Sequence, residues 1–137
     1  MIQGQIVWFE IPVKDLDRSM FFYSEVLAIK IQKVKFLEQE YGILNKDKDT
    51  IKGVLIERKD HNPKTEIILF FYVVDILESL REVVRLGGQI VIGKTMLKQK
   101  TKDGQILITS NLIDGELGYY AEFIDCEGNR ICLYSNS

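Results

Sequence analysis

The side chains most able to do chemistry lie in two apolar runs far apart in the sequence. Trp8 and Glu10 stand two residues apart in one run, and Arg130, Cys132 and Tyr134 alternate in the other. In an extended strand, residues two apart point to the same face. The sequence therefore predicts one face that carries an indole and a carboxylate, and another that carries a guanidinium, a thiol and a phenol.

Glu10 is the most informative of these residues, because a carboxylate on an otherwise apolar strand is costly to bury unless it is paired or protonated. One interpretation is a polar anchor for a bound molecule, or a general base that makes Glu10 the candidate catalytic residue. The other is a structural ion pair with Arg130 or a lysine, or hydrogen bonds to the rest of the fold. The sequence leaves both interpretations open.

Cys132 could act as a nucleophile, but a catalytic thiol needs a neighbouring base or positive charge to activate it. The only histidine, His61, lies in a polar segment, residues 59–65, that we expect to be a solvated linker. A packed, unreactive thiol is therefore the favoured interpretation of Cys132. The other cysteine, Cys126, lies six residues away across a turn, which is not the pattern of a disulfide framework.

Composition indicates a compact protein and excludes several classes of function. The 137 residues are 46% hydrophobic and carry a formal net charge of -2, which suits one domain or two small repeats around a core. Acidic and basic residues are interspersed, unlike the basic surface of a nucleic-acid-binding protein. No apolar run reaches the ~18 residues of a membrane span, and no signal-peptide pattern opens the sequence. We expect a reduced, cytoplasmic protein.

A strand–helix–strand order would position the first pair of candidate residues. Residues 5–13 are a predicted strand, and Asp15 is a typical N-cap for an amphipathic helix that continues through residues 16–27. The next three predicted strands, which read as an antiparallel meander, cover residues 28–36, 38–45 and 51–58.

The same order returns after the linker. Residues 66–74 are a predicted strand, Asp75 caps a second helix, and Gly87 and Gly88 close that helix. The remaining predicted strands cover residues 89–97, 116–124 and 130–135.

The repeat predicts two modules, residues 5–58 and 66–136, within a single domain over residues 1–137. The second module is the longer, because residues 98–115 form an unusually long connection with its own apolar centre. That insertion is either an added hairpin arm that covers a site or a decorated surface loop.

Two stretches resemble a known superfamily. The first, "FEIPVKDLDRSMFFYSEVLAIKI" (residues 9–31), contains a strand, an Asp-Leu-x-Arg joint and an aromatic pair ending in Phe-Tyr. The second, "GYYAEFIDCEGNRICLYS" (residues 118–135), is similar to a strand–turn–strand of the form G-aromatic-x-A-x-F-x-D-P-E-G-N, with Cys126 in place of proline. Both patterns resemble those of the glyoxalase/bleomycin resistance protein/extradiol dioxygenase superfamily, also called the vicinal-oxygen-chelate superfamily.

The resemblance implies an α+β fold, in which two βαβββ modules form an open, U-shaped mixed sheet around a cleft, with the helices outside. It also implies a homodimer, which many members form. In the metal-dependent members, His, Glu or Gln ligands come from the first strand and a late strand of each module. They hold a metal that keeps open positions for two vicinal oxygens of the substrate.

Aligned on that pattern, the ligand positions of this chain hold residues that do not suit a metal. They fall on Trp8, Leu69 and Cys132, and on a loosely aligned position between Leu55 and Glu57. An indole or a leucine side chain cannot ligate a divalent cation, and the chain has no second histidine. The resemblance therefore predicts neither a metal nor another cofactor.

The function that the resemblance favours is metal-independent binding of a small organic ligand in the sheet cleft, as in the antibiotic-sequestering members. The alternative is a lyase or dioxygenase of the same superfamily, either metal-dependent or using Glu10 as an acid/base group. A third is a structural role with a vestigial cleft. Mostly apolar walls with a few polar groups are typical of a ligand pocket. The predicted ligand-binding residues are Trp8, Glu10, Leu69, Phe71, Arg130, Cys132 and Tyr134.

Overall fold

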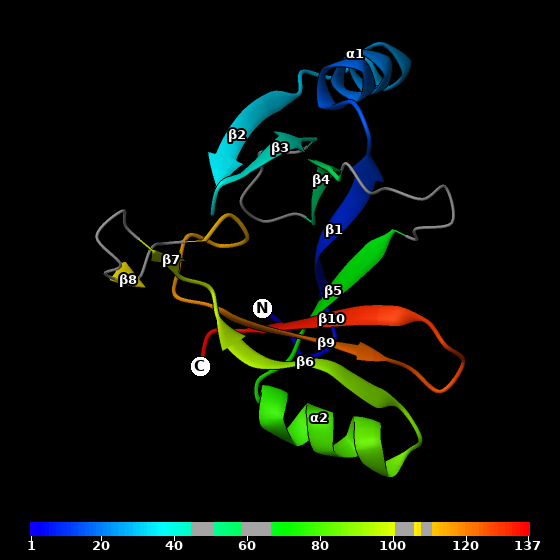
Figure 1. The fold of residues 1–137 in the computed structure, drawn as a ribbon, viewed down its shortest axis with the longest axis vertical. Helices are drawn as coiled ribbons and strands as arrows, with labels where there is room; N and C mark the ends of the chain where they lie inside the picture. Colours follow the sequence, from blue (N-terminus) through cyan, green and yellow to red (C-terminus); the bar gives the residue numbers. More distant parts are fainter. Residues whose placement is uncertain (45–50, 59–66, 101–105, 108–110) are drawn as a thin grey trace. The chain divides into compact units, whose positions relative to one another are not determined.

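A computed structural model describes residues 1–44, 51–58, 67–100, 106–107 and 111–137 (Figure 1). The chain forms two compact units. The first unit is Trp8–Ile68, and the second unit joins Met1–Val7 to Leu69–Ser137. Each unit combines one helix with a four-stranded mixed sheet in the order strand, helix, three strands. The predicted α+β fold built of βαβββ modules is therefore confirmed.

In the first unit, the strands lie in the order β2-β3-β4-β1. The strands β2, β3 and β4 form the antiparallel meander that the sequence predicts, and β1 is parallel to β4. The only helix in the described part of this unit is α1. The elements are β1 (Ile6–Val13), α1 (Leu16–Leu27), β2 (Gln32–Phe36), β3 (Gln39–Ile43) and β4 (Lys52–Glu57).

The helix α1 begins and packs as its sequence pattern predicts. The side chain of Asp15 accepts a hydrogen bond from the backbone N–H of Arg18 at 3.0 Å, so it is the N-cap. Leu16 then packs with Val13 and Leu55 in a small core between α1 and the sheet. This core identifies which face of each strand points toward α1.

In the second unit, the strands lie in the order β5-β10-β9-β6. The strand β5 is parallel to β10, and β9 is antiparallel to both β10 and β6. The insertion contains a separate antiparallel pair, β7 (Gln99–Lys100) with β8 (Ile106–Leu107). The other elements are β5 (Ile68–Tyr72), α2 (Ile76–Arg85), β6 (Gln89–Met96), β9 (Tyr119–Ile124) and β10 (Arg130–Ser135).

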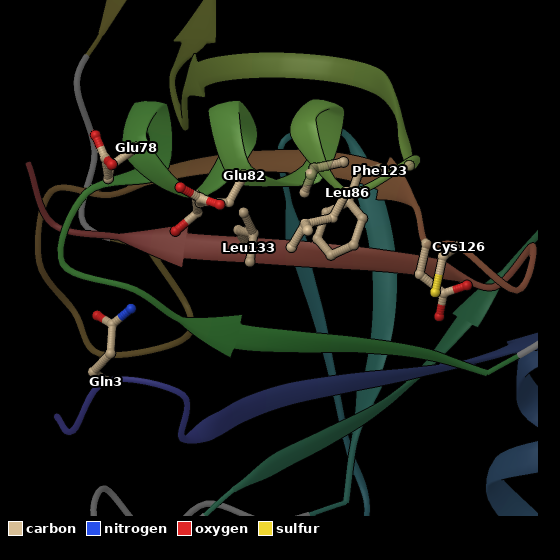
Figure 2. Close-up of a pocket in the computed structure, with 11 residues that line it drawn as sticks. Gln3, Glu78, Glu82, Leu86, Phe123, Cys126 and Leu133 are labelled. Atoms are coloured by element: carbon tan, nitrogen blue, oxygen red, sulfur yellow. The ribbon is translucent and has the colours of Figure 1, made fainter.

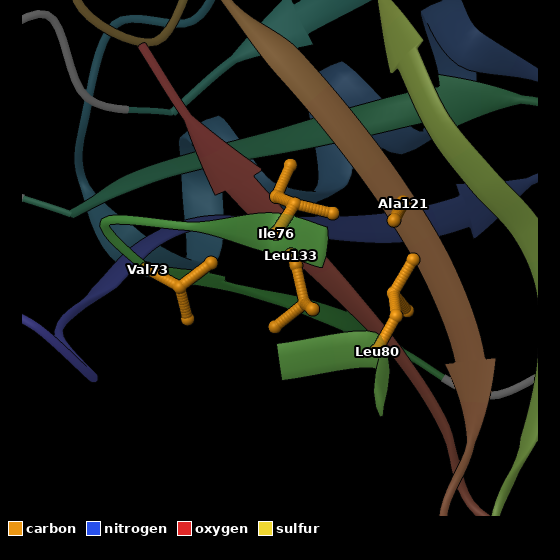
Figure 3. Packing of buried hydrophobic residues seen from close by; sticks show 5 residues of the cluster. All are labelled: Val73, Ile76, Leu80, Ala121 and Leu133. Carbon is orange, nitrogen blue, oxygen red and sulfur yellow. The ribbon is translucent and has the colours of Figure 1, made fainter. Parts of the chain in front are cut away.

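The core of the second unit lies between α2 and its sheet (Figure 3). Asp75 caps α2 by accepting a hydrogen bond from the backbone N–H of Glu78 at 3.2 Å. Gly87 follows the helix with φ +95°, a conformation that glycine adopts without strain. No helix in the described ranges is long and apolar enough to cross a membrane. The core residues are Val73, Ile76, Leu80, Ala121 and Leu133.

The Asp-Cys-Glu-Gly-Asn stretch between β9 and β10 is a tight turn built by its own side chains. Asp125 Oδ1 accepts hydrogen bonds from the backbone N–H groups of Glu127 and Asn129, at 2.8 and 2.9 Å. Gly128 has φ +91°. These hydrogen bonds hold the pKa of the Asp125 carboxyl below its usual range. Turn formation therefore accounts for the Asp, Gly and Asn residues of this motif, which is one of the two that resemble the superfamily.

Candidate functional site

The first candidate site lies on the face of the first unit's sheet that points away from α1. Ile11 and Val13 point from β1 toward the α1 core, so Trp8 and Glu10 point to the opposite face. Both side chains are buried, with Trp8 4% and Glu10 9% exposed. The shared face predicted for Trp8 and Glu10 is confirmed by their direct hydrogen bond.

The Glu10 carboxylate is held at both of its oxygens. Its Oε2 accepts a hydrogen bond from Trp8 Nε1 at 3.1 Å, and its Oε1 lies 3.5 Å from Arg58 Nη2. The Glu10 side chain is 12% exposed and that of Arg58 is 42% exposed. The ion pair therefore joins a buried carboxylate to a guanidinium that still faces solvent.

Tyr41, from β3, adds a second aromatic ring beside Trp8. The two rings meet edge to face, with centroids 6.2 Å apart and an interplanar angle of 74°. Burial raises the pKa of Tyr41 to about 12, and the nearby charge of Glu10 acts in the same direction. The Tyr41 phenol is therefore neutral at physiological pH and able to donate a hydrogen bond.

Sequence reasoning did not identify Arg58 as the partner of Glu10. It proposed Arg130 or a lysine, whereas the structure places Arg58 directly after β4, the strand parallel to β1. Glu10 lies opposite Val54 in that pairing, and Arg58 donates its backbone N–H to the carbonyl of Val13 at 2.8 Å. The parallel pairing of β1 with β4 would have indicated Arg58 as the partner of Glu10, but strand pairing cannot be read from a single sequence.

The second unit has its own buried carboxylate on the sheet face that points away from α2. Glu122 of β9 lies opposite Cys132 of β10, and only 5% of Glu122 is exposed. Its Oε1 lies 2.6 Å from Arg130 Nη2 and accepts a hydrogen bond from Cys132 Sγ at 3.9 Å. The predicted common face of Arg130 and Cys132 is thus present, with Glu122 between them.

Glu122 was missed from the sequence, although a signal for it exists. It stands between Ala121 and Phe123 in an apolar strand, which is the same pattern that singled out Glu10. Ala121 and Phe123 pack in the α2 core, so alternation sends Glu122 to the other face. Each unit therefore keeps one buried carboxylate paired with a half-exposed arginine.

Tyr134, a predicted ligand-binding residue, is used by the fold. Its hydroxyl donates to Asp114 Oδ1 at 2.8 Å and accepts hydrogen bonds from the side-chain amides of Asn111 and Asn136, at 2.7 and 3.1 Å. None of its surface is exposed. One donor and two acceptor positions are the full capacity of a phenol. Tyr134 thus anchors the segment before β9, and ligand contact by it stays a prediction.

Phe71 was predicted to line the ligand cleft together with Cys132 and Tyr134, but it lies on the other face of the sheet from them. It lies beside Leu133 in the parallel β5–β10 pairing and packs against the α2 core. Alternation puts Leu69 on the side of Phe71. The predicted grouping is therefore wrong. Alternation within β5 shows which of its residues share a face. It does not show which residues of β10 lie on that face, because this depends on the register between the two strands.

The superfamily's metal-ligand positions do not assemble a metal site from these residues. Trp8 and Leu69 have no atom suited to a divalent cation, and Leu55 is fully buried in the α1 core. Among the described residues, no group of three or more His, Cys, Asp or Glu side chains could hold a metal ion. His61 lies outside the described residues.

Comparison with known proteins agrees with the fold. Residues 5–40 match the family described as bleomycin resistance protein-like N-terminal. A hypothetical protein from Bacillus halodurans is 15% identical with a TM-score of 0.63, covering 98% of this chain and 95% of that chain. A glyoxalase/bleomycin resistance protein/dioxygenase superfamily member from Vibrio splendidus is 13% identical with a TM-score of 0.57, covering 97% and 99%.

A third similar structure is a complex with a coenzyme A compound. It is a variant of Streptomyces coelicolor methylmalonyl-CoA epimerase in complex with 2-nitronate-propionyl-CoA, 14% identical with a TM-score of 0.58 and covering 99% of both chains. No curated protein matches the sequence. The full-length likenesses show that the chain has the fold of the glyoxalase/bleomycin resistance protein/dioxygenase superfamily member from Vibrio splendidus, and the family match covers the first strand and helix of this chain.

Proposed function

We propose that this protein binds a small organic ligand, without a metal, at the face of the first unit's sheet that carries Glu10. The observation that carries the proposal is the Glu10 carboxylate, buried beside the rings of Trp8 and Tyr41 and paired with Arg58. Burying a charge is costly, and a hydrophobic pair of similar size would serve stability at least as well. A binding role explains why the polar group is kept there.

The arrangement suggests which ligand groups this face recognises. The Glu10 carboxylate pairs with the Arg58 guanidinium, which is 42% exposed and carries further N–H donors suited to a carboxylate, phenolate or carbonyl oxygen. The neutral phenol of Tyr41 supplies a further donor. The rings of Trp8 and Tyr41 form an apolar wall. A small aromatic or acyl compound with an oxygen acceptor fits these groups.

Metal independence rests on the residues at the superfamily's ligand positions, where Trp8 and Leu69 cannot ligate a cation. The competing proposal is a lyase or dioxygenase of the same superfamily that uses Glu10 as an acid/base group. The homodimer and the cytoplasmic location that the sequence suggested stay part of the proposal. Light scattering on the purified protein checks the dimer.

The test uses the single tryptophan of the chain as a reporter, because Trp8 hydrogen-bonds directly to Glu10. A panel of small aromatic carboxylates, phenols and acyl thioesters is titrated while Trp8 fluorescence is followed. We expect a saturable change with at least one compound, weakened about tenfold or more by Arg58→Gln, as for the loss of a charge-assisted hydrogen bond.

Three results would change this proposal. No saturable response to any compound would contradict ligand binding at this face. Consumption of a bound compound, abolished by Glu10→Gln, would favour the enzyme. Stoichiometric metal in the purified protein, measured by elemental analysis and lost in Glu10→Ala, would overturn metal independence.

A further inference from the structure

A pocket of about 520 Å³ lies on the α2 side of the second unit's sheet, the face opposite to Glu122. Its apolar lining includes Phe123 and Leu133 from the sheet and Leu86 from the end of α2 (Figure 2). Its volume falls in the range of small-molecule pockets, roughly 300–1,000 Å³. The pocket is thus large enough for a compact organic molecule, and all of its lining residues belong to the second unit.

The N-terminal segment fixes one side of this pocket. Gln3 lines it, and Gln3 Oε1 accepts a hydrogen bond from the backbone N–H of Val74 at 2.7 Å. Gly4 donates its backbone N–H to the carbonyl of Tyr72 at 2.7 Å. The segment is therefore attached at the end of β5, so that Gln3 is held in place as a polar group at the pocket.

The charged residues that line the pocket are all acidic. Glu78 and Glu82 come from α2, and Asp125 comes from the turn after β9. None of the eleven residues that line it is a lysine, arginine or histidine. An apolar floor with an acidic margin is complementary to a molecule that has an apolar body and a positive charge.

The existing partners of these carboxylates leave them able to bind a cation. Glu78 pairs with Arg81 at 2.8 Å and Glu82 with Arg85 at 2.6 Å, both as exposed pairs within one helix. Such surface pairs are weak and exchange with solvent. Asp125 is held in its turn by backbone and side-chain N–H donors and keeps its charge.

The other side of α2 provides an internal contrast. A pocket of about 550 Å³ there is lined by Leu77, Leu80, Val84 and Ile90, and its charged residues are Arg81 and Lys94. One helix thus separates two apolar hollows of similar size and opposite charge. If apolar surface alone decided binding, the two pockets would accept the same molecules.

We propose that the pocket lined by Glu78, Glu82, Phe123 and Leu133 binds a small amphipathic cation, with an aromatic or short alkyl body and an amine or quaternary ammonium group. The body lies on Phe123 and Leu133, where it replaces water on apolar surface. The ammonium group lies at the carboxylates of Glu78 and Glu82, which are on the same face of α2 at i and i+4.

The experiment compares two probes of the same shape and opposite charge. 3-Phenylpropylammonium and 3-phenylpropionate are each titrated into the ¹⁵N-labelled full chain, followed by amide chemical shifts. We expect the cation to shift the amides of Glu82, Leu86, Gly88 and Cys126 saturably, and the anion to bind there about tenfold more weakly or not at all.

Two variants test the carboxylates. The double variant Glu78→Gln, Glu82→Gln should bind the cation about tenfold more weakly than the wild type does. Addition of 0.5 M salt should also lower the affinity of the wild type for the cation. Lys94→Gln, a change of the same kind in the other pocket, should leave the affinity unchanged. Far-UV circular dichroism confirms that the variants are folded.

Three outcomes would overturn the inference: no saturable shift with the cation, equal affinity for the anion, or no effect of the two glutamine substitutions. Trp8 fluorescence separates this site from the proposed function, because the only tryptophan belongs to the first unit. A cation that changes Trp8 fluorescence but not the amides of α2 binds elsewhere and contradicts this inference.

Discussion

At the scale of single residues, the described ranges of the chain contain two buried carboxylates, both on strand faces that point away from a helix. Glu10 pairs with Arg58, and Glu122 pairs with Arg130. The sequence singled out Glu10 because period-two alternation exposes a charged residue in an apolar run. The same test, applied to every strand, would have found Glu122. Neither arginine could be assigned from the sequence, because each pair joins residues from different strands or their ends.

The ion pair of Glu10 leads to a stability prediction. Arg58→Gln removes a positive charge next to a buried carboxylate, and we expect it to lower the free energy of unfolding by about 1–2 kcal/mol, less than for a fully buried pair because Arg58 is half exposed. Urea unfolding followed by circular dichroism measures the loss.

The matched control for this prediction is Arg81→Gln, which breaks the exposed pair with Glu78 on α2. It should cost less than about 0.5 kcal/mol. If the two variants lose the same free energy of unfolding, the burial of Glu10 does not make its ion pair with Arg58 more stabilising than an exposed pair.

Tyr41 leads to a prediction about alkaline pH. Its pKa in the folded protein is about 12 against an ordinary value of 10.0. The folded state therefore holds the proton more tightly than the unfolded state, so this contribution to stability is complete below pH 10 and is lost as the pH rises toward 12. Tyr41→Phe should remove the part of the alkaline loss of stability that comes from ionisation of Tyr41.

The measurement is the free energy of unfolding from urea titrations at several values between neutral and alkaline pH, for the wild type and Tyr41→Phe. The difference between the two should change across the window from pH 10 to 12. A difference that stays constant would contradict the raised pKa of Tyr41. Absorbance at the tyrosinate band gives an independent check.

At the scale of elements, local signals in the sequence located the strands and helices well. Asp15 and Asp75 cap the two helices as predicted, because an aspartate with an extended backbone at this position can accept a hydrogen bond from a free N–H group of the first turn. The glycine after α2 and the turn between β9 and β10 were also visible. The face of β5 was assigned wrongly, because Phe71 belongs to the α2 core.

Gly118 shows how a motif residue serves the packing of an element. A Cβ atom there would lie 2.5 Å from Tyr134 Cε2 and 2.6 Å from Asn111 Nδ2. Both neighbours are fixed by their shared hydrogen bond, so neither moves easily. We expect Gly118→Ala to lower the free energy of unfolding by about 1–3 kcal/mol, the usual cost of overpacking.

Gly93 of β6 is the control, because nothing lies within 4 Å of a Cβ built there and its φ is not positive. Gly93→Ala should change the free energy of unfolding by less than about 0.5 kcal/mol. If thermal or urea unfolding shows no difference between the two alanine variants, the close packing of Gly118 against Tyr134 is not important for stability.

At the scale of the whole molecule, the order of elements and two local motifs are enough to predict the glyoxalase-like fold. The strand–helix joint occurs once in each half of the chain, and the strand–turn–strand motif lies near its end. The full-length likenesses to solved structures agree with that fold, and residues 5–40 match the bleomycin resistance protein-like N-terminal family. The ligand is not identified by any of them, because this fold carries many different functions.

Metal independence gives a prediction for the intact protein. Treatment with EDTA followed by dialysis should change the melting temperature by less than about 1 °C, because a metal bound to the native state would raise it in proportion to its occupancy. Zinc, nickel, manganese and iron(II), added back singly, should have equally small effects. A fall in melting temperature that one metal reverses would contradict the proposal and support the metal-dependent alternative.

The sequence by itself determined the element order, the helix caps, the turn at Asp125 and the shared face of Trp8 and Glu10. These features depend on residues a few positions apart, so local spacing is enough to specify them. Only the tertiary structure decided that Arg58 meets Glu10, that Glu122 joins Arg130 and Cys132, and that Phe71 packs under α2. Those contacts depend on which strands pair and in what register, and pairing brings together residues that are distant in the chain.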